Sequence, residues 1–473
     1  MKLIQANKKH RGLKIFGCTF LGIVLLLGIT LTTLVSYSHF YYIPEQDAKI
    51  KNDTGLIQAH NRALYDKNGN KIYLAGSNVG NMLLQEGWMS PFSAGPKKDE
   101  NGNPIKEKNG TYQYPEFTEE EFLNALKENP NCGEENIDTW TSYYYSKWFN
   151  EFDFKKMKEL GLNTIRLPFY WRNILNDYSE GLTRKSEQVA FKLFNEYLEL
   201  AKKYDMYIIL DLHGAPGSQN GYEHGGVLQE KGELYYNEDY IKATVDIWDY
   251  ISDYYTNTRK DLAPYIASYD IMNEPCMVKD KNTTKPVWEI FDKCYDAIRE
   301  NNDKHVVTFC GVWDFSGLPN PKDYGRENVQ YQYHWYNWQG DKIPYNLFYA
   351  YHDMFNMFRN YNVPVLMGEF TLFEYKDEWT KAFEMYKKRN YNWTTWSYKV
   401  ISLGDWQNSW GIYTACLNPD GLDKGEIVHK LDVTNCTFEE FKKYSDLCES
   451  SSANCKTGTQ YNAIVNWRDN IMK

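Results

Sequence analysis

The 473-residue sequence predicts an α/β protein built as a closed (β/α)8 TIM barrel, preceded by a single N-terminal transmembrane helix. Three observations support this expectation. Eight short apolar runs recur along the chain, amphipathic stretches lie between them, and one long uncharged run lies near the N-terminus. An open doubly wound sheet is the alternative, but it would need a G-x-G-x-x-G fingerprint after an early strand, and none is present.

Each apolar run is expected to form one strand of the barrel. The runs span residues 71–80, 162–171, 206–214, 266–275, 305–311, 328–336, 363–373 and 392–400. Amphipathic stretches that predict helices on the outside of the barrel span residues 149–160, 187–204 and 285–301. Ahead of the first strand, residues 59–75 alternate apolar and polar positions around Asn68-Gly69, which predicts a β-hairpin.

An insertion and a tail accompany the predicted barrel. The barrel domain is expected over residues 56–425, with residues 90–148 as an insertion after the first strand. Within the insertion, residues 117–129 contain a Thr-x-x-Glu capping box, which predicts a helix. Residues 426–473 are expected to pack on the barrel as a cysteine-containing appendage with a helix that begins near Thr437.

The N-terminal segment predicts a membrane anchor. Residues 15–35 carry no charge and are long enough to cross a hydrocarbon core of about 30 Å. Basic residues flank only their N-terminal side, so residues 1–14 are expected in the cytoplasm and residues 36–55 as an external stalk. The expected product is a single-pass type II membrane protein whose main domain is extracellular or lumenal. Cleavage at the small residues Ser36 and Ser38, which would release a secreted protein, is the alternative.

The cysteine count and the glycosylation sequons agree with that compartment. Of nine cysteines, Cys18 lies in the uncharged run, and the remaining even number permits disulfides in an oxidising compartment. Within residues 416–455 the spacing is short, so at least one disulfide is expected there. Among the N-x-[ST] sequons, Asn109 and Asn282 lie in polar stretches and are the best candidates for glycans, whereas Asn392 is expected in a buried strand.

The charge of the chain excludes one class of partner. The formal net charge is −10, from 53 basic and 63 acidic residues, which is a poor match for nucleic acid. Aromatic residues make up 16% of the chain. Their rings can stack on the flat apolar faces of a ligand, and a large packed core explains them equally well.

Polar residues near the C-terminal ends of the expected strands form a candidate active site, because these ends face the mouth of such a barrel. The residues are Asn78, Arg166, His213, Asn273, Glu274, His334, Tyr336, Glu369 and Trp396. Glu274 and Glu369 would lie on roughly opposite walls. Two such carboxyl groups suit cleavage of a glycosidic bond, where one protonates the leaving oxygen and the other acts at the anomeric carbon.

These motifs resemble glycoside hydrolase family 5, whose members are retaining β-glycosidases on a TIM barrel. IMNEP at 271–275 and MGEF at 367–370 carry the resemblance to the family. LDLHGAPGSQNG at 210–221, GNMLLQEGWMSPF at 80–92 and the stretch 148–171 resemble its exo-β-1,3-glucanase branch. The resemblance covers roughly residues 56–415.

The chain departs from the branch after the second glutamate. The branch has a Trp-Ser pair where this chain has Phe370-Thr371, and residues 393–399 are more similar to other members of the family. The departure leaves the linkage specificity open.

The resemblance implies a role for each candidate residue. Glu274 is similar to the general acid/base and Glu369 to the nucleophile. Glu274 must carry a proton near neutral pH, so its pKa is expected to be raised by apolar surroundings and by the other carboxylate. Arg166 is expected to keep Glu369 ionised.

The remaining residues are implied to bind or orient the sugar. Asn273 would hold the sugar 2-hydroxyl, and Trp396 would stack beneath the ring. His213, His334 and Tyr336 would orient the two glutamates and the sugar. Glu86, in the string QEGW, would bind hydroxyls of the terminal glucose.

No cofactor and no metal are expected. His213, Glu223 and His224 match no zinc-binding spacing, and a glycosidase of this type needs no metal. We expect a monomer that acts on a β-glucan, with β-1,3-glucan favoured, and glucosylated lipids or other β-linked glycans are the alternative substrates. A glycosyltransferase is disfavoured because no Asp-x-Asp triplet occurs. A carbohydrate-binding ectodomain without turnover is the alternative of another class.

Overall fold

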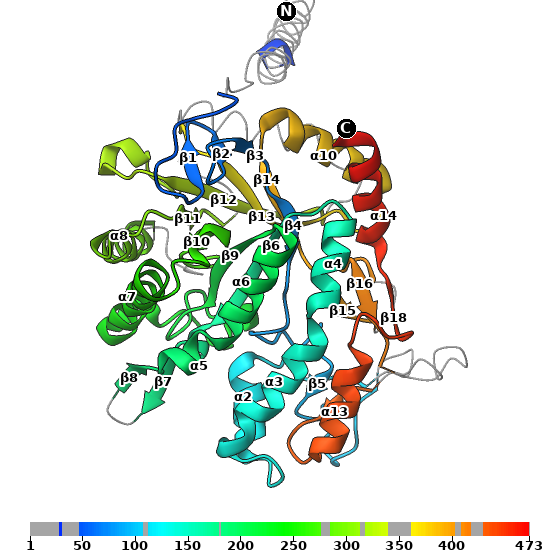
Figure 1. Cartoon of the computed structure of the whole chain (residues 1–473). Helices are drawn as coiled ribbons and strands as arrows, with labels where there is room; N and C mark the ends of the chain where they lie inside the picture. Colours follow the sequence, from blue (N-terminus) through cyan, green and yellow to red (C-terminus); the bar gives the residue numbers. More distant parts are fainter. Residues whose placement is uncertain are drawn as a thin grey trace, which may run out of the picture.

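A closed barrel of eight parallel strands forms the centre of the structure (Figure 1). This computed structural model describes residues 28–30, 47–106, 112–178, 181–275, 284–312, 317–338, 361–402, 408–417 and 429–472. The barrel strands are β4 (Ala75–Asn78), β6 (Thr164–Tyr170), β9 (Tyr207–Gly214), β10 (Ile266–Asp270), β11 (Val307–Cys310), β12 (Val329–Tyr336), β13 (Val365–Thr371) and β14 (Asn392–Thr395). They pair in chain order, and β14 pairs with β4 to close the barrel. The predicted barrel is confirmed, and the open sheet is wrong.

Helices on the outside of the barrel alternate with these strands (Figure 1). They are α4 (Glu151–Glu159), α6 (Lys192–Tyr204), α7 (Glu238–Asp253), α8 (Thr284–Glu300) and α10 (Lys376–Arg389). Each has an apolar stripe against the strands, as shown by the fully buried Phe154, Phe194 and Trp248. The helix predicted over 187–204 is two helices, because a short α5 (Glu187–Ala190) ends at Phe191, whose ring stacks on Tyr254.

A small antiparallel sheet covers the N-terminal end of the barrel. It consists of β1 (Gln58–His60), β2 (Ala63–Tyr65) and β3 (Lys71–Ile72), and the predicted hairpin is the β2–β3 pair. Gly69 has φ +77° in the turn, and a Cβ there would come within 2.0 Å of the Ile50 carbonyl oxygen. Apolar side chains of this sheet and of the strands form one buried cluster that includes Leu64, Ile209 and Leu366. This end of the barrel is therefore closed by apolar packing.

The insertion and the tail pack against each other (Figure 1). The insertion contains β5 (Phe92–Ser93), α2 (Glu119–Glu128) and α3 (Ile137–Trp148), and the tail contains β17 (Leu431–Asp432), α13 (Phe438–Leu447) and α14 (Thr459–Asn466). The capping box predicted for α2 is present, and α13 begins after its cap Thr437 as predicted. β17 pairs with β5, and the ring of Phe441 stacks on Phe92 with centroids 4.7 Å apart.

The remaining strands form two small sheets. β15 (Lys399–Ile401) pairs with β16 (Tyr413–Ala415), which pairs with β18 (Cys455–Thr457). β7 (Leu175–Tyr178) and β8 (Gly181–Arg184) form a hairpin after β6. Through β18, the tail is joined to the segment that follows the last barrel strand.

The predicted membrane anchor falls largely outside the described residues. Of residues 15–35 only 28–30 are described, and residues 1–14 and most of 36–55 are not. Within the described part of the chain, no helix combines the length and the apolar character needed to span a membrane.

The disulfide predicted in the tail is not formed by three of its cysteines. Cys436, Cys448 and Cys455 are free thiols. The Sγ of Cys436 lies 3.8 Å from the Asn129 amide nitrogen, and the ten residues of α13, about 15 Å of helix, separate it from Cys448. That spacing is too wide for a disulfide between Cys436 and Cys448, since the Cα atoms of a disulfide lie within about 7 Å.

The predicted glycan sites have different outcomes. Asn109 and Asn282 lie outside the described residues. Asn392 is buried on β14, as expected, and its side chain accepts a hydrogen bond from the Leu74 amide at 2.9 Å. Asn392 is therefore inaccessible to a glycan in the folded protein.

The packing between insertion and tail makes a prediction about stability. Phe441 is fully buried between Phe92 and Trp140. Phe441→Ala should lower the free energy of unfolding by about 3–5 kcal/mol, because a large buried ring is lost and a cavity remains. Urea denaturation followed by tryptophan fluorescence measures this change. Leu228→Ala, at a side chain that is 51% exposed, is the control and should change stability by less than about 0.5 kcal/mol.

Candidate active site

The guanidinium of Arg166 lies at the centre of the site. Arg166 projects from β6 into the barrel and is fully buried. Its Nη1 donates to Glu369 Oε1 at 2.8 Å and to Asn78 Oδ1 at 2.9 Å. Its Nη2 donates to Asn273 Oδ1 at 2.8 Å. One planar cation therefore fixes side chains that come from β4, from β13 and from the end of β10.

Two buried aspartates that sequence reasoning missed complete the shell around Arg166. Asp211 Oδ1 on β9 lies 3.0 Å from Nη2, and Asp270 Oδ2 on β10 accepts from Nε at 2.8 Å. Burial raises the pKa of Asp211 to about 7 and that of Asp270 to about 6, although the charge of Arg166 acts in the opposite direction. Strand alternation could have identified Asp211, because it lies two positions before His213 and so faces the same side.

Glu369 receives donors on both oxygens. Oε1 accepts from Arg166, and Oε2 accepts from the Tyr336 hydroxyl at 2.6 Å. Burial raises the pKa of Tyr336 well above its usual value, so the phenol keeps its proton and remains a donor. This pair of donors suits a carboxylate whose position is fixed from two sides.

Glu274 follows β10 at a strained backbone position. Its φ is +38°, a conformation that costs a residue with a side chain about 1–3 kcal/mol. The loop after β9 supports this position, because Gln219 Nε2 donates to the Asn273 carbonyl at 2.9 Å and Asn220 Nδ2 to the Glu274 carbonyl at 3.2 Å. The side chains of Gln219 and Asn220 therefore hold the backbone at Glu274 in place. This role was not predicted from the sequence.

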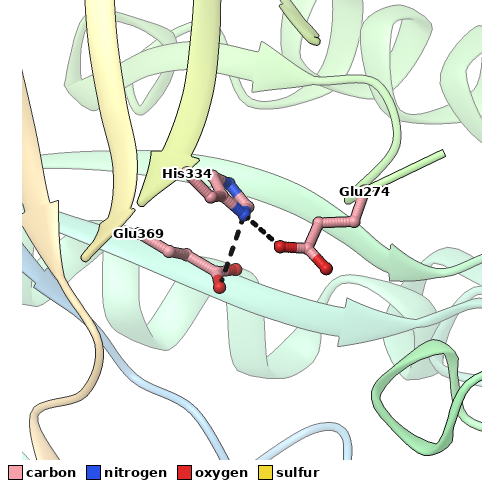
Figure 2. A group of neighbouring side chains, drawn as sticks. All are labelled: Glu274, His334 and Glu369. Carbon is pink, nitrogen blue, oxygen red and sulfur yellow. Dashed lines mark hydrogen bonds and ion pairs between the residues drawn. The ribbon is translucent and has the colours of Figure 1, made fainter. Parts of the chain in front are cut away.

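Two imidazoles contact the carboxyl group of Glu274. His334 Nδ1 lies 2.7 Å from Oε1, and His224 Nε2 lies 3.1 Å from Oε2. Figure 2 shows His334 between Glu274 and Glu369, and its Nδ1 is also 3.5 Å from Glu369 Oε2. Burial acts to lower the pKa of His334, but the charge of Glu369 and the bond to Glu274 raise it well above its usual value.

The predicted direction of the Glu274 pKa is wrong. Burial acts to raise this pKa, but the hydrogen bonds from His224 and His334 outweigh burial and lower it well below its usual value. The prediction considered apolar surroundings and a second carboxylate. It did not include His224, which the sequence analysis considered only as a metal ligand and rejected.

His213 and Asn273 form a neutral hydrogen-bonded pair. His213 Nδ1 lies 2.6 Å from Asp211 Oδ2, and Nε2 lies 3.3 Å from Asn273 Nδ2. Burial lowers the pKa of His213 to about 3, so Nδ1 carries the single proton and donates it to Asp211. Nε2 then accepts from the Asn273 amide, whose oxygen already accepts from Arg166. Asn273 is thus fixed on both sides and keeps one N–H for a ligand.

Trp396 and Glu86 lie at the edge of this network. The Trp396 ring stacks on His213 with centroids 5.3 Å apart, and a Cβ at Gly80 would come within 3.0 Å of the ring. Glu86 Oε2 accepts from Trp88 Nε1 at 2.7 Å, whereas Oε1 is buried and has no hydrogen-bond partner among the described residues. Burial raises the pKa of Glu86 to about 8. A buried oxygen of this kind can accept a hydroxyl of a ligand.

The predicted site residues come together at one end of the barrel. Direct contacts link Arg166, His213, Asn273, Glu274, His334, Tyr336, Glu369 and Trp396, and Asn78 bonds to Arg166. Glu86 lies near enough to Glu369 for the two charges to interact. The structure therefore assembles residues from separate strands into a single polar cluster.

The central donor atoms could also be considered for a metal ion. One donor atom each of Glu274, His334 and Glu369 lies within 4.8 Å of the other two. His334 Nδ1, however, faces two carboxylates at 2.7 and 3.5 Å, as expected of an N–H donor and not of a free lone pair. The arrangement suits two carboxyl groups that act on one substrate with an imidazole between them.

A family model and curated proteins match parts of this chain. Residues 125–401 match the family model described as cellulase (glycosyl hydrolase family 5). A protein of Phanerodontia chrysosporium named beta-xylosidase is 25% identical over 58% of this chain and 50% of its own length. A protein of Wickerhamomyces anomalus named glucan 1,3-beta-glucosidase 2 is 32% identical over 41% of this chain and 43% of its own length. The chain therefore spans half or less of the length of these relatives.

A solved structure has the same fold. The crystal structure of rutinosidase from Aspergillus niger aligns with a TM-score of 0.53 at 17% identity and covers 72% of this chain and 95% of its own. At that identity the likeness concerns the fold alone.

The aspartates beside Arg166 predict how stability changes with pH. The pKa of Asp211 is raised to about 7 from about 3.8, so the folded protein keeps a proton that the unfolded chain has released between these values. The stability contributed by this proton is present at low pH and is lost as pH rises from 4 to 7. Between pH 4 and 8 the free energy of unfolding of the wild type, measured by urea denaturation, should therefore decline. In Asp211→Asn, which has no proton to lose at this position, the decline should be smaller by roughly 2–4 kcal/mol.

Asp261→Asn provides the control for this experiment. The pKa of Asp261 is lowered to about 2 by Arg259, so this carboxyl group does not titrate between pH 4 and 7. The variant should keep the wild-type slope. An unchanged slope in Asp211→Asn as well would contradict the assignment.

Proposed function

The chain belongs to glycosyl hydrolase family 5, and we propose that it is a retaining β-glycosidase that hydrolyses O-glycosidic bonds of β-glucans. One observation carries the mechanistic part of this proposal. A carboxyl oxygen of Glu274 and a carboxyl oxygen of Glu369 lie within 4.8 Å of each other. Retaining enzymes place their carboxyl groups about 5–5.5 Å apart, whereas inverting enzymes leave roughly 6.5–9.5 Å for a water molecule.

The first step forms a bond between Glu369 and the sugar. The Glu369 oxygen attacks the anomeric carbon while Glu274, as a carboxylic acid, protonates the leaving oxygen. Arg166 and the Tyr336 hydroxyl hold the attacking carboxylate in one orientation at 2.8 and 2.6 Å. Fixing the nucleophile in advance reduces the entropy cost of reaching the transition state.

The second step releases the sugar with its configuration retained. Glu274, now a carboxylate, accepts a proton from water as the water attacks the anomeric carbon and the bond to Glu369 breaks. His334 Nδ1 faces both carboxyl groups, so its N–H can donate to whichever of them is ionised at each step. His334 therefore serves both half-reactions from one position.

Three further side chains supply binding groups for the sugar. The N–H that Asn273 keeps would donate to the 2-hydroxyl, and the unpaired Oε1 of Glu86 would accept a hydroxyl of the terminal glucose. Trp396 would support the ring from below. His213 acts indirectly, because its contact with Asn273 orients the amide.

We propose β-1,3-linked glucan as the favoured substrate. The strings at 80–92 and 210–221 that resemble the exo-β-1,3-glucanase branch support this choice, as do relatives named glucan 1,3-beta-glucosidase. Glucosylated lipids and other β-linked glycans are the alternative, favoured by the departure at Phe370-Thr371. A binding ectodomain without turnover is less well supported, since both carboxyl groups and their donors are present.

We also propose that the protein acts at a membrane outside the cytosol. The support is the uncharged run 15–35 with basic residues only before it. In this arrangement the N-terminal helix holds a monomeric catalytic domain beside its glycan substrate. Secretion after cleavage of the run is the alternative.

The mechanism predicts different defects in the two glutamate variants. Glu369→Ala removes the nucleophile and should abolish turnover of every substrate. Glu274→Ala removes the proton donor, so it should spare the first step for a dinitrophenyl β-glucoside, whose leaving group needs no proton, and slow the second. Added azide should then restore turnover and yield a β-glycosyl azide, detected by NMR. An α-glycosyl azide would show that the enzyme inverts.

The substrate proposal predicts a specific order of rates. The full chain is incubated with β-1,3-, β-1,4- and β-1,6-glucans and with a glucosylated ceramide, and the products are separated by chromatography. Release of glucose should be fastest from β-1,3-glucan, at least about tenfold above the others, which corresponds to about 1.4 kcal/mol in transition-state binding. Glu369→Ala is the matched control for background hydrolysis. Faster cleavage of the ceramide would favour the glycolipid alternative.

A further inference from the structure

His224 contacts the acid/base glutamate, although the mechanism above gives it no role. It lies in a short 3-10 turn, Glu223–Gly225, within the loop that follows β9. Its Nε2 is 3.1 Å from Glu274 Oε2, and its side chain is 22% exposed. His334 takes the other oxygen of Glu274, so the two histidines hold opposite sides of one carboxyl group.

Local packing fixes the ring of His224. The Tyr222 ring stacks on it with centroids 5.5 Å apart, and Asn220 Nδ2 lies 2.9 Å from its Nε2. Asn220 also donates to the Glu274 carbonyl, so the same amide positions the histidine and the backbone of the glutamate. Tyr222 and Asn220 therefore hold the ring of His224 in place beside Glu274.

The groups around His224 are mostly acidic. Glu274 faces it from the end of β10, Glu86 from the segment after β4, and Glu223 from its own loop, while the neutral His213 lies on β9. Burial acts to lower the pKa of His224, but these carboxylates raise it to about 9. His224 is the more exposed partner, because its side chain is 22% exposed against 8% for Glu274 and none for His334.

Two neighbours of His224 Nε2 favour different positions of a proton shared with Glu274. The carboxylates favour the proton on Nε2, which then donates to Glu274 Oε2. The Asn220 amide, 2.9 Å from the same Nε2, favours a nitrogen with a free lone pair, and the proton then lies on the carboxyl group. These opposing contacts make the transfer a short movement between two atoms at hydrogen-bond distance.

We propose that His224 is a positioning residue that stores the proton of Glu274, an inference that rests on the retaining mechanism proposed above. Before the first step the proton lies on Nε2. It moves to Glu274 Oε2, and the resulting carboxylic acid protonates the glycosidic oxygen as the bond from that oxygen to the anomeric carbon breaks and the bond to Glu369 forms. In the second step Glu274 removes a proton from water and returns it to Nε2, so the cycle is balanced.

The test uses His224→Gln, which keeps an N–H donor beside Glu274 but cannot titrate. The pH dependence of kcat/KM is measured for phenyl β-glucoside, whose leaving group needs a proton, and for 2,4-dinitrophenyl β-glucoside, whose leaving group does not. With the phenyl substrate the alkaline limb should move to lower pH by at least about one unit, because the stored proton is lost. With the dinitrophenyl substrate kcat/KM should fall by no more than about threefold.

Matched variants make the result specific to His224. His60→Gln, at a surface histidine paired with Asp47, should leave both profiles unchanged. His224→Asn serves if His224→Gln does not fold, because it also removes titration. When Glu274→Gln is already present, adding His224→Gln should not change the pH dependence of kcat/KM any further. The reason is that His224 acts through Glu274.

Two outcomes separate this inference from the proposed function. A uniform loss of kcat/KM at every pH, with the alkaline limb unmoved for both His224 variants, would assign His224 a structural role only and overturn the proton store. Full activity of Glu274→Gln on phenyl β-glucoside would instead overturn the role of Glu274 itself, and with it the proposed mechanism.

Discussion

The site depends on the placement of one buried cation. Arg166 lies inside the barrel with no solvent exposure, so its charge must be balanced by protein groups. Asp211, Asp270 and Glu369 supply that balance, and each comes from a different strand. The barrel closes around these ion pairs, and the same contacts set the position of Glu369, the proposed nucleophile. Under the proposed mechanism a substitution of Arg166 would therefore affect both stability and catalysis.

A second group of contacts works on the backbone. The loop after β9 reaches the end of β10 through Gln219 and Asn220, which bond to the carbonyls of Asn273 and Glu274. The positive φ of Glu274 persists because these bonds compensate its strain. The loop thus positions Glu274, the proposed acid/base, while its His224 contacts the carboxyl group. Backbone support and the proposed proton store come from the same stretch, residues 219–224.

Local patterns in the sequence predicted most of the fold. The eight strands, the hairpin at Gly69 and the caps at Thr118 and Thr437 each depend on a few neighbouring residues, and all are present. Polar residues at strand ends also located the active site, because the barrel brings those ends together. The resemblance to a family added roles that spacing alone could not give.

The failures concern contacts between residues far apart in the sequence. The pKa of Glu274 depends on His224, which is 50 residues away, and no local pattern indicates that contact. Strand alternation places Asp211 on the same side as His213, but no local pattern indicates that Asp211 and Asp270 pair with Arg166. Cys436 likewise contacts Asn129 of the insertion, which is far from it in the sequence.

The pairing of insertion and tail has a consequence for how the chain folds during translation. Ser93 and Leu431 are in contact although 338 residues separate them. At about 5–20 residues per second, the ribosome makes the second partner roughly 20–70 seconds after the first. Phe92 and Trp140, both fully or almost fully buried in the finished protein, lack their partner Phe441 throughout that interval. This part of the core can therefore be completed only after the segment that carries Phe441 has been synthesised.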